Sequence, residues 1–134
     1  MAEKEMNIQV QATSMRTCLG NKAETLAAMH NNVCGLKYNE PFGMFAGVCD
    51  INAVEEYTRF ESLLIEQIGN VIEQSRFSLC EKDCRLIIST TKGNVELLSK
   101  DCENLHEDVF LHTAAMKVAS HFNSANCPIV ISNA

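Results

Sequence analysis

The sequence lacks the segments that would carry a protein into or across a membrane. No apolar run approaches the roughly 18 residues that a membrane-spanning helix needs. The first residues, 1–6, are charged and short, unlike a secretory signal peptide. We therefore expect a cytoplasmic protein with no membrane span.

The sequence also lacks a basic run. It carries 11 Lys and Arg residues against 17 Asp and Glu residues, a net charge of -6, and the basic residues are scattered. Phosphate backbones and anionic lipid surfaces attract clustered positive charge. We therefore expect neither nucleic acid nor an anionic membrane as a partner.

Cysteine, in contrast, is abundant, with seven residues in a chain of 134. An odd number without an export signal indicates reduced thiols, which we expect to pack as small hydrophobic residues, Cys127 included. Cys80 and Cys84 could form half of a zinc site, but no second close pair of Cys or His follows at ligand spacing. The sequence therefore predicts no metal site.

Three predicted helices begin after an Asn that stands three positions before a Glu, the spacing of a helix capping box. Each Asn precedes an amphipathic pattern. The predicted caps and helices are Asn21 with 22–33, Asn52 with 53–74 and Asn104 with 105–122. Strict alternation over 8–13 predicts a strand with one buried face.

Two further strands are predicted at 85–91 and 129–133. The first is apolar on both faces, as in a central parallel strand. Because a helix separates them, they should form a βαβ unit with parallel strands. With the other elements, this predicts one α/β domain over residues 1–134 with a layered, mostly parallel sheet.

Ligands of open α/β sheets bind beyond the carboxyl ends of the strands, here 89–94 and 132–134. The first stretch has hydroxyls, a lysine and a glycine, which would suit phosphate. It lacks the P-loop and Rossmann glycine spacings, so we expect an ordinary turn and no nucleotide cofactor. The histidines fall at spacings that share no helix face and are interpreted as surface or interface residues: His30, His106, His112 and His121.

The final stretch, Pro128–Ala134, resembles the strand that leads into the nucleophile of the β-ketoacyl synthases, the condensing enzymes of fatty acid and polyketide synthesis. Other stretches resemble the same family in the same order. They are residues 10–21 ending in Leu-Gly-Asn, the helix start Tyr57–Phe60, the strand and turn 86–94, and the helix at 111–115 before the last strand. Residues 14–18 depart from it, because the family has glycines and a proline there.

The resemblance implies that the chain is most of the first, N-terminal half of a thiolase fold, an incomplete domain that ends just before the nucleophile cysteine. The parent enzyme would catalyse decarboxylative Claisen condensation on acyl carrier protein. This chain would itself hold no catalytic residue and be inactive. Its site residues would be the active-site approach Ser132, Asn133 and Ala134, and a substrate-pocket or dimer-interface loop of Thr91, Lys92 and Asn94.

The family also forms dimers through this last strand, which implies a homodimer through residues 128–134. An apolar strand with a free edge invites such pairing in any case. The alternative is therefore a noncatalytic dimerising interaction protein, or a partner subunit related to the synthases.

Overall fold

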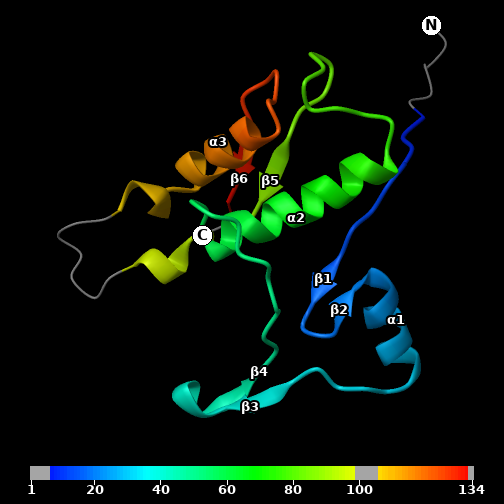
Figure 1. The fold of residues 1–134 in the computed structure, drawn as a ribbon, viewed down its shortest axis with the longest axis vertical. Coiled ribbons are helices and arrows are strands. Elements are labelled where there is room, and N and C mark those ends of the chain that lie inside the picture. The colour runs from blue at the N-terminus through cyan, green and yellow to red at the C-terminus, as the bar shows by residue number, and fades with distance from the viewer. Residues whose placement is uncertain (1–6, 99–105, 133–134) are drawn as a thin grey trace, which may run out of the picture.

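The computed structural model describes residues 7–98 and 106–132 and shows a mixed α/β chain with three helices and six short strands in that part (Figure 1). Three single turns of 3-10 helix, at Glu40–Phe42, Val95–Leu97 and Glu107–Val109, join them. The helices and strands are β1 (Arg16–Thr17), β2 (Gly20–Asn21), α1 (Lys22–His30), β3 (Lys37–Asn39), β4 (Met44–Ala46), α2 (Arg59–Gln74), β5 (Ile87–Ser89), α3 (Leu111–His121) and β6 (Ile129–Ile131).

The βαβ unit predicted from the sequence is confirmed by β5, α3 and β6. The two strands pair in parallel, with Ile88 opposite Val130. Ile88 is buried and α3 supplies most of the remaining core. The buried hydrophobic residues are Ile65, Ile88, Ala114, Ala115, Val118 and Ala119.

The predicted mostly parallel sheet is wrong for the described residues. They form three separate two-stranded sheets, and β1–β2 and β3–β4 are antiparallel hairpins. Gly43, with φ of 62°, supplies the left-handed residue that turns the second hairpin back. The expectation that β5 is buried on both faces is also wrong, since Ile87 is 58% exposed.

The strand predicted over 8–13 is not formed. This segment is extended, but it makes no backbone hydrogen bond within the described part of the chain. Ile8 and Val10 are 84% and 79% exposed. The alternating pattern predicted which residues share a face but could not supply a neighbouring strand.

The first predicted helix cap is confirmed. The Asn21 side chain accepts from the Glu24 N–H at 3.1 Å, and Glu24 Oε2 accepts from the Asn21 N–H at 2.8 Å. The helix ends at His30 rather than at residue 33, because Asn32 adopts a left-handed φ of 54°. The apolar face expected on this helix is largely exposed, and its buried residue is Thr25.

The second predicted cap is wrong. Glu56 has a left-handed φ of 70°, so no helix runs through it. The capping box is made by Thr58 and Glu61, and α2 begins at Arg59. Its predicted end at Gln74 is confirmed. The third predicted cap, Asn104, lies outside the described residues, and α3 begins only at Leu111.

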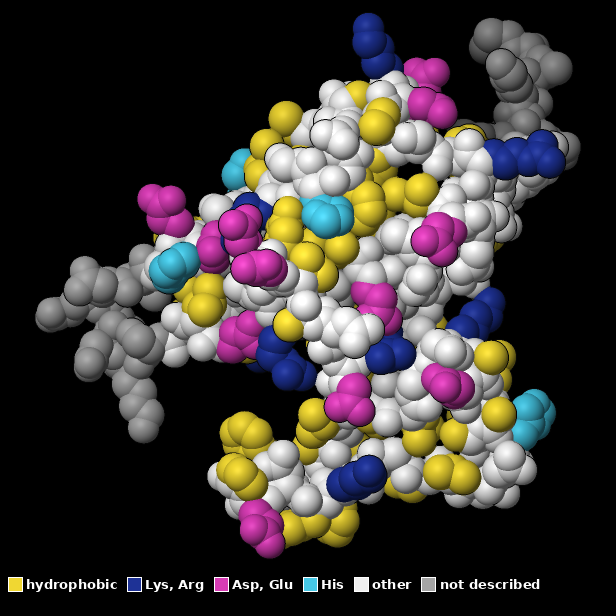
Figure 2. Space-filling view, in the orientation of Figure 1, with side chains coloured by type: hydrophobic (Ala, Val, Ile, Leu, Met, Phe, Trp, Pro, Cys, Tyr) yellow, Lys and Arg dark blue, Asp and Glu magenta, His cyan; other side chains and the backbone are white. Residues whose placement is uncertain are grey.

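The segments from β1 to β4 extend away from α2, α3 and the parallel pair (Figure 1). Many of their large apolar side chains are exposed, and Figure 2 shows them as yellow patches on that part of the surface. They are Leu26, Met29, Val33, Leu36, Tyr38, Phe42, Met44 and Phe45, and the exposed Val48 follows β4. The described part of the chain contains no helix long and apolar enough to cross a membrane.

Candidate functional site

The carboxyl ends of β5 and β6 meet at one edge of the molecule. Ile129 N–H donates to Leu86 O at 2.9 Å and Thr90 N–H donates to Ile131 O at 3.1 Å, so the ladder continues to the ends of both strands. This pairing brings residues 90–92 and Ser132 to the same edge. Two of the stretches singled out in the sequence are therefore neighbours.

The turn after β5 is organised by Thr90. Its Oγ1 accepts from the backbone N–H of Lys92 at 3.3 Å and of Gly93 at 3.2 Å. Gly93 has φ of 62°, and a Cβ there would overlap Leu111 Cδ2. The turn thus requires glycine for its backbone conformation and for its close approach to α3.

The predicted loop residues divide into two environments. Thr91 and Lys92 are exposed, as is Ser132, which follows β6. Asn94 is 1% exposed. Asn133 and Ala134, the other two residues of the predicted approach, lie outside the described residues.

Asn94 joins the turn to the amino terminus of α2. Its Oδ1 accepts from Thr58 Oγ1 at 2.6 Å, and its Nδ2 donates to Glu61 Oε1 at 3.1 Å and to Asp108 O at 2.7 Å. Both amide hydrogens and the carbonyl oxygen are thereby satisfied. In this conformation Asn94 holds the turn in place and its amide is unavailable to solvent.

Glu61 is the most deeply buried charged side chain described, with 0% exposure. Its Oε2 accepts from the Thr58 N–H at 3.0 Å and lies 3.2 Å from Lys117 Nζ. Lys117 Nζ also lies 3.1 Å from Asp108 Oδ2. The ammonium on α3 therefore stands between two carboxylates, one of them without access to water.

This environment shifts the protonation of Lys117. Partial burial lowers its pKa, but the hydrogen bonds to Asp108 and Glu61 and their negative charges together outweigh burial. The pKa of Lys117 is therefore raised above its usual 10.5. A lysine held protonated in this way is a structural cation and a poor general base.

The sequence reasoning missed this cluster of Thr58, Glu61, Asn94, Asp108 and Lys117. Two signals could have indicated parts of it. The spacing of Thr58 and Glu61 is that of a capping box, and Lys117 is the one cation in an otherwise small and apolar stretch, 114–119.

The cysteines do not pack as predicted. Cys34, Cys80 and Cys127 are exposed, and the other three in the described residues are half-buried. The interpretation of Cys127 as a packed residue is therefore wrong, because the residue before Pro128 faces solvent. Residues 7–98 and 106–132 contain no group of three His, Cys, Asp or Glu side chains that could hold a metal ion.

The histidines occupy the surface, as predicted. All four are exposed. His121 contacts a second ionisable side chain, because its Nδ1 lies 3.2 Å from Tyr57 Oη and the two rings pack edge to face. His106 Nδ1 lies 3.6 Å from Asp108 Oδ2.

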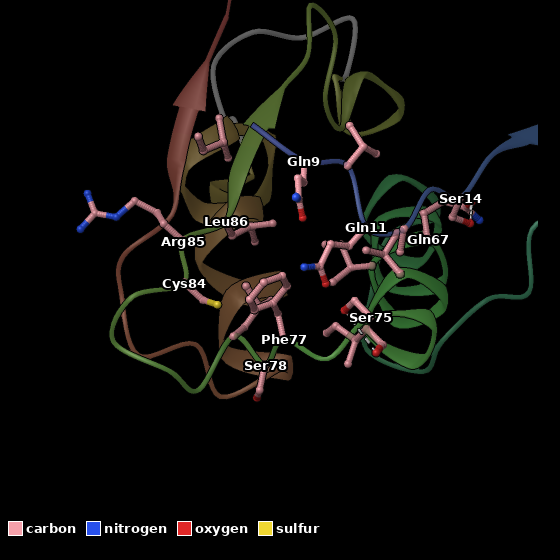
Figure 3. A pocket seen from close by; sticks show the side chains of 17 residues that line it. Gln9, Gln11, Ser14, Gln67, Ser75, Phe77, Ser78, Cys84, Arg85 and Leu86 are labelled. Atoms are coloured by element: carbon pink, nitrogen blue, oxygen red, sulfur yellow. Dashed lines mark hydrogen bonds between the residues drawn. The ribbon is translucent and has the colours of Figure 1, made fainter. Parts of the chain in front are cut away.

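A separate apolar groove of about 640 Å³ lies between residues 9–14, α2 and β5 (Figure 3). Gln9 and Gln11 project into it from the N-terminal segment, whereas Arg85 points away. Its apolar lining includes Ile68, Val71, Ile72, Phe77, Leu79 and Leu86.

A scan against models of protein families and searches among curated proteins and solved structures found no match to this chain. The fold and the geometry described above therefore stand alone as support for a function.

Proposed function

We propose that this chain provides the approach to the active site of a β-ketoacyl synthase-like condensing enzyme and carries no catalytic residue itself. The parent enzyme would accept an acyl group on a cysteine and join it, by decarboxylative Claisen condensation, to a unit held on acyl carrier protein. The finer fold that accompanies this proposal is a thiolase-like half.

The observation that supports the proposal most directly is the parallel pairing of β5 and β6 across α3. It sets the turn 90–94 beside Ser132, at the edge where a parallel sheet presents its chemistry. In the resembling family the nucleophile follows this last strand at the start of a helix. A cysteine there has its thiolate stabilised by free N–H groups and the helix dipole.

The test is the gene sequence downstream of the codon for Ala134, together with a chemical assay of this chain. The proposal expects an in-frame Cys followed by a small residue, Ser and Gly. It also expects that this chain, incubated with acyl carrier protein thioesters, releases no condensation product and is not acylated at a single thiol. Stoichiometric acylation at one cysteine would contradict the assignment of no catalytic residue, and a stop codon there would contradict the parent enzyme.

A second candidate function is a noncatalytic dimerising protein or partner subunit. It is favoured by the exposed apolar residues of β6, since Ile129 and Ile131 are 39% and 53% exposed. Within the described residues β6 pairs only with β5, so its other edge has no strand partner. A stop codon after Ala134 together with a stable dimer would favour this function.

A further inference from the structure

The N-terminal segment 8–13, called the strap below, is extended beside the apolar groove without being held to it by backbone bonds. Its carboxyl end is fixed to α2, because Ser14 Oγ donates to Gln67 Oε1 at 2.6 Å and accepts from Asn70 Nδ2 at 3.4 Å. The strap itself makes no backbone hydrogen bond within the described residues. It is therefore tethered at its carboxyl end, where Thr13 Oγ1 also accepts from Lys22 Nζ at 2.6 Å.

On the opposite side of the groove, β5 has backbone groups able to form the hydrogen bonds that the strap lacks. Leu86 O and Thr90 N–H both point toward β6. Because successive backbone groups of a strand point to alternate edges, those of Ile87 and Ser89 point away from β6. In the described residues β5 has no partner other than β6, so this second edge is unpaired.

The strap borders the groove with both of its faces, since Val10 and Ala12 line it as well as the glutamines. Gln9 and Gln11 project into a space lined by Ile68, Val71 and Phe77 (Figure 3). Ile8 and Val10, which alternate with the glutamines, are 84% and 79% exposed. A strand whose pairing register shifts by one residue exchanges its two faces. Such a shift would bury the apolar face of the strap and place the glutamines in water.

We propose that the strap closes over the groove by pairing its backbone with the free edge of β5 and burying Val10 and Ala12, which line the groove while Val10 stays 79% exposed. The structure holds the open arrangement, with the strap tethered at Ser14 and the groove accessible. Closure adds a third strand to the β5–β6 pair and covers the apolar lining. It requires no ligand and does not depend on the proposed condensing function.

Amide hydrogen exchange measured by NMR on the full chain tests the strap. Closure predicts that the N–H groups of Ile87 and Ser89 exchange at least about tenfold more slowly than unprotected amides, since an opening equilibrium sets the rate. Val10→Asp should remove this protection, because a carboxylate cannot enter the apolar groove. Val48→Asp, at another exposed valine, should leave it unchanged.

Two further measurements keep the result decisive. If Val10→Asp does not fold, Val10→Thr replaces one methyl by a hydroxyl and should give an intermediate loss of protection. Dilution should leave the protection unchanged, since the strap and β5 belong to one chain. The proposal is overturned if Ile87 and Ser89 exchange at the unprotected rate, if Val10→Thr and Val48→Asp act alike, or if protection disappears on dilution, which would assign the pairing to a second copy.

Discussion

Lys117 Nζ lies 3.2 Å from Glu61 Oε2, and this ion pair joins α3 to the first turn of α2. The lysine side chain is 31% exposed and the glutamate is 0% exposed. Asn94 Nδ2 donates to Glu61 Oε1, and the Thr58 N–H donates to Oε2, so the buried carboxylate has partners on both oxygens. The relationship connects the two helices that enclose the core beside the parallel strands.

Lys117→Met should destabilise the chain because it leaves Glu61 charged in a site without water. We expect a loss of about 2–3 kcal/mol in the free energy of unfolding, less than for a fully enclosed pair because Lys117 is partly solvated. Urea denaturation would measure it. The double variant Lys117→Met with Glu61→Gln should recover part of the loss, and a double variant as unstable as Lys117→Met alone would contradict the ion pair.

The same pair should make stability depend on alkaline pH. The folded state raises the pKa of Lys117 above 10.5 and so holds the proton more tightly than the unfolded chain. The stabilisation is therefore complete below the unfolded pKa and is lost as the pH rises through the folded pKa. Unfolding of the wild type and of Lys117→Met, compared between neutral pH and pH above 10.5, should show their difference shrinking at the alkaline end. A constant difference would argue against the shift.

The capping box of α2 can be tested against the one that the sequence favoured. Thr58→Ala removes the hydroxyl that accepts from the Glu61 N–H and donates to Asn94, and we expect it to cost about 1–2 kcal/mol. Asn52→Ala, at the position predicted from the sequence, should change the free energy of unfolding by less than about 0.5 kcal/mol. Thr58→Ser keeps the hydroxyl and serves as the control. Equal losses in the free energy of unfolding at positions 52 and 58 would support the helix start after Asn52 that the sequence predicts.

These two caps show what local patterns could and could not predict. Asn52 and Glu55 have the same spacing as Thr58 and Glu61, so the spacing alone cannot rank them. Contacts from distant parts of the chain accompany the cap that forms. Asn94 accepts from Thr58, and Glu96 Oε1 accepts from the Arg59 N–H at 3.1 Å.

The parallel pair was predictable because each strand is a short apolar run with a helix between them. The strand predicted at 8–13 does not form. An alternating pattern determines which residues share a face, but it does not specify the neighbouring strand. Asn94 was singled out as a loop residue of a site. Its burial depends on Glu61 and Asp108, which no spacing in the sequence brings beside it.

The exposed side chains of β6 lead to a prediction on association. Ile131 is half-exposed beside an edge of β6 that has no strand partner in the part of the chain that the structure describes, so we expect the chain to dimerise through this strand. Ile131→Lys should shift light scattering toward the monomer, because two lysines would be brought together across the edge. Val48→Lys, at an exposed position remote in sequence, should leave the dimer intact. A wild-type chain that stays monomeric at high concentration would contradict this interface.

The turn at Gly93 offers a test with a matched control in the same chain. Gly93 and Gly43 both have φ of 62°, but a Cβ at Gly43 meets no atom within 4 Å, whereas one at Gly93 would overlap Leu111. Gly43→Ala should therefore cost only the backbone strain, about 1–2 kcal/mol, and Gly93→Ala should cost about 1–3 kcal/mol more from the overlap. Urea denaturation of both variants would measure the difference.

In a double-mutant cycle, Leu111→Ala should reduce the destabilisation caused by Gly93→Ala, because it removes the Leu111 Cδ2 atom that the new Cβ would overlap. If Gly93→Ala and Gly43→Ala were equally costly, the turn would not pack against α3 as described.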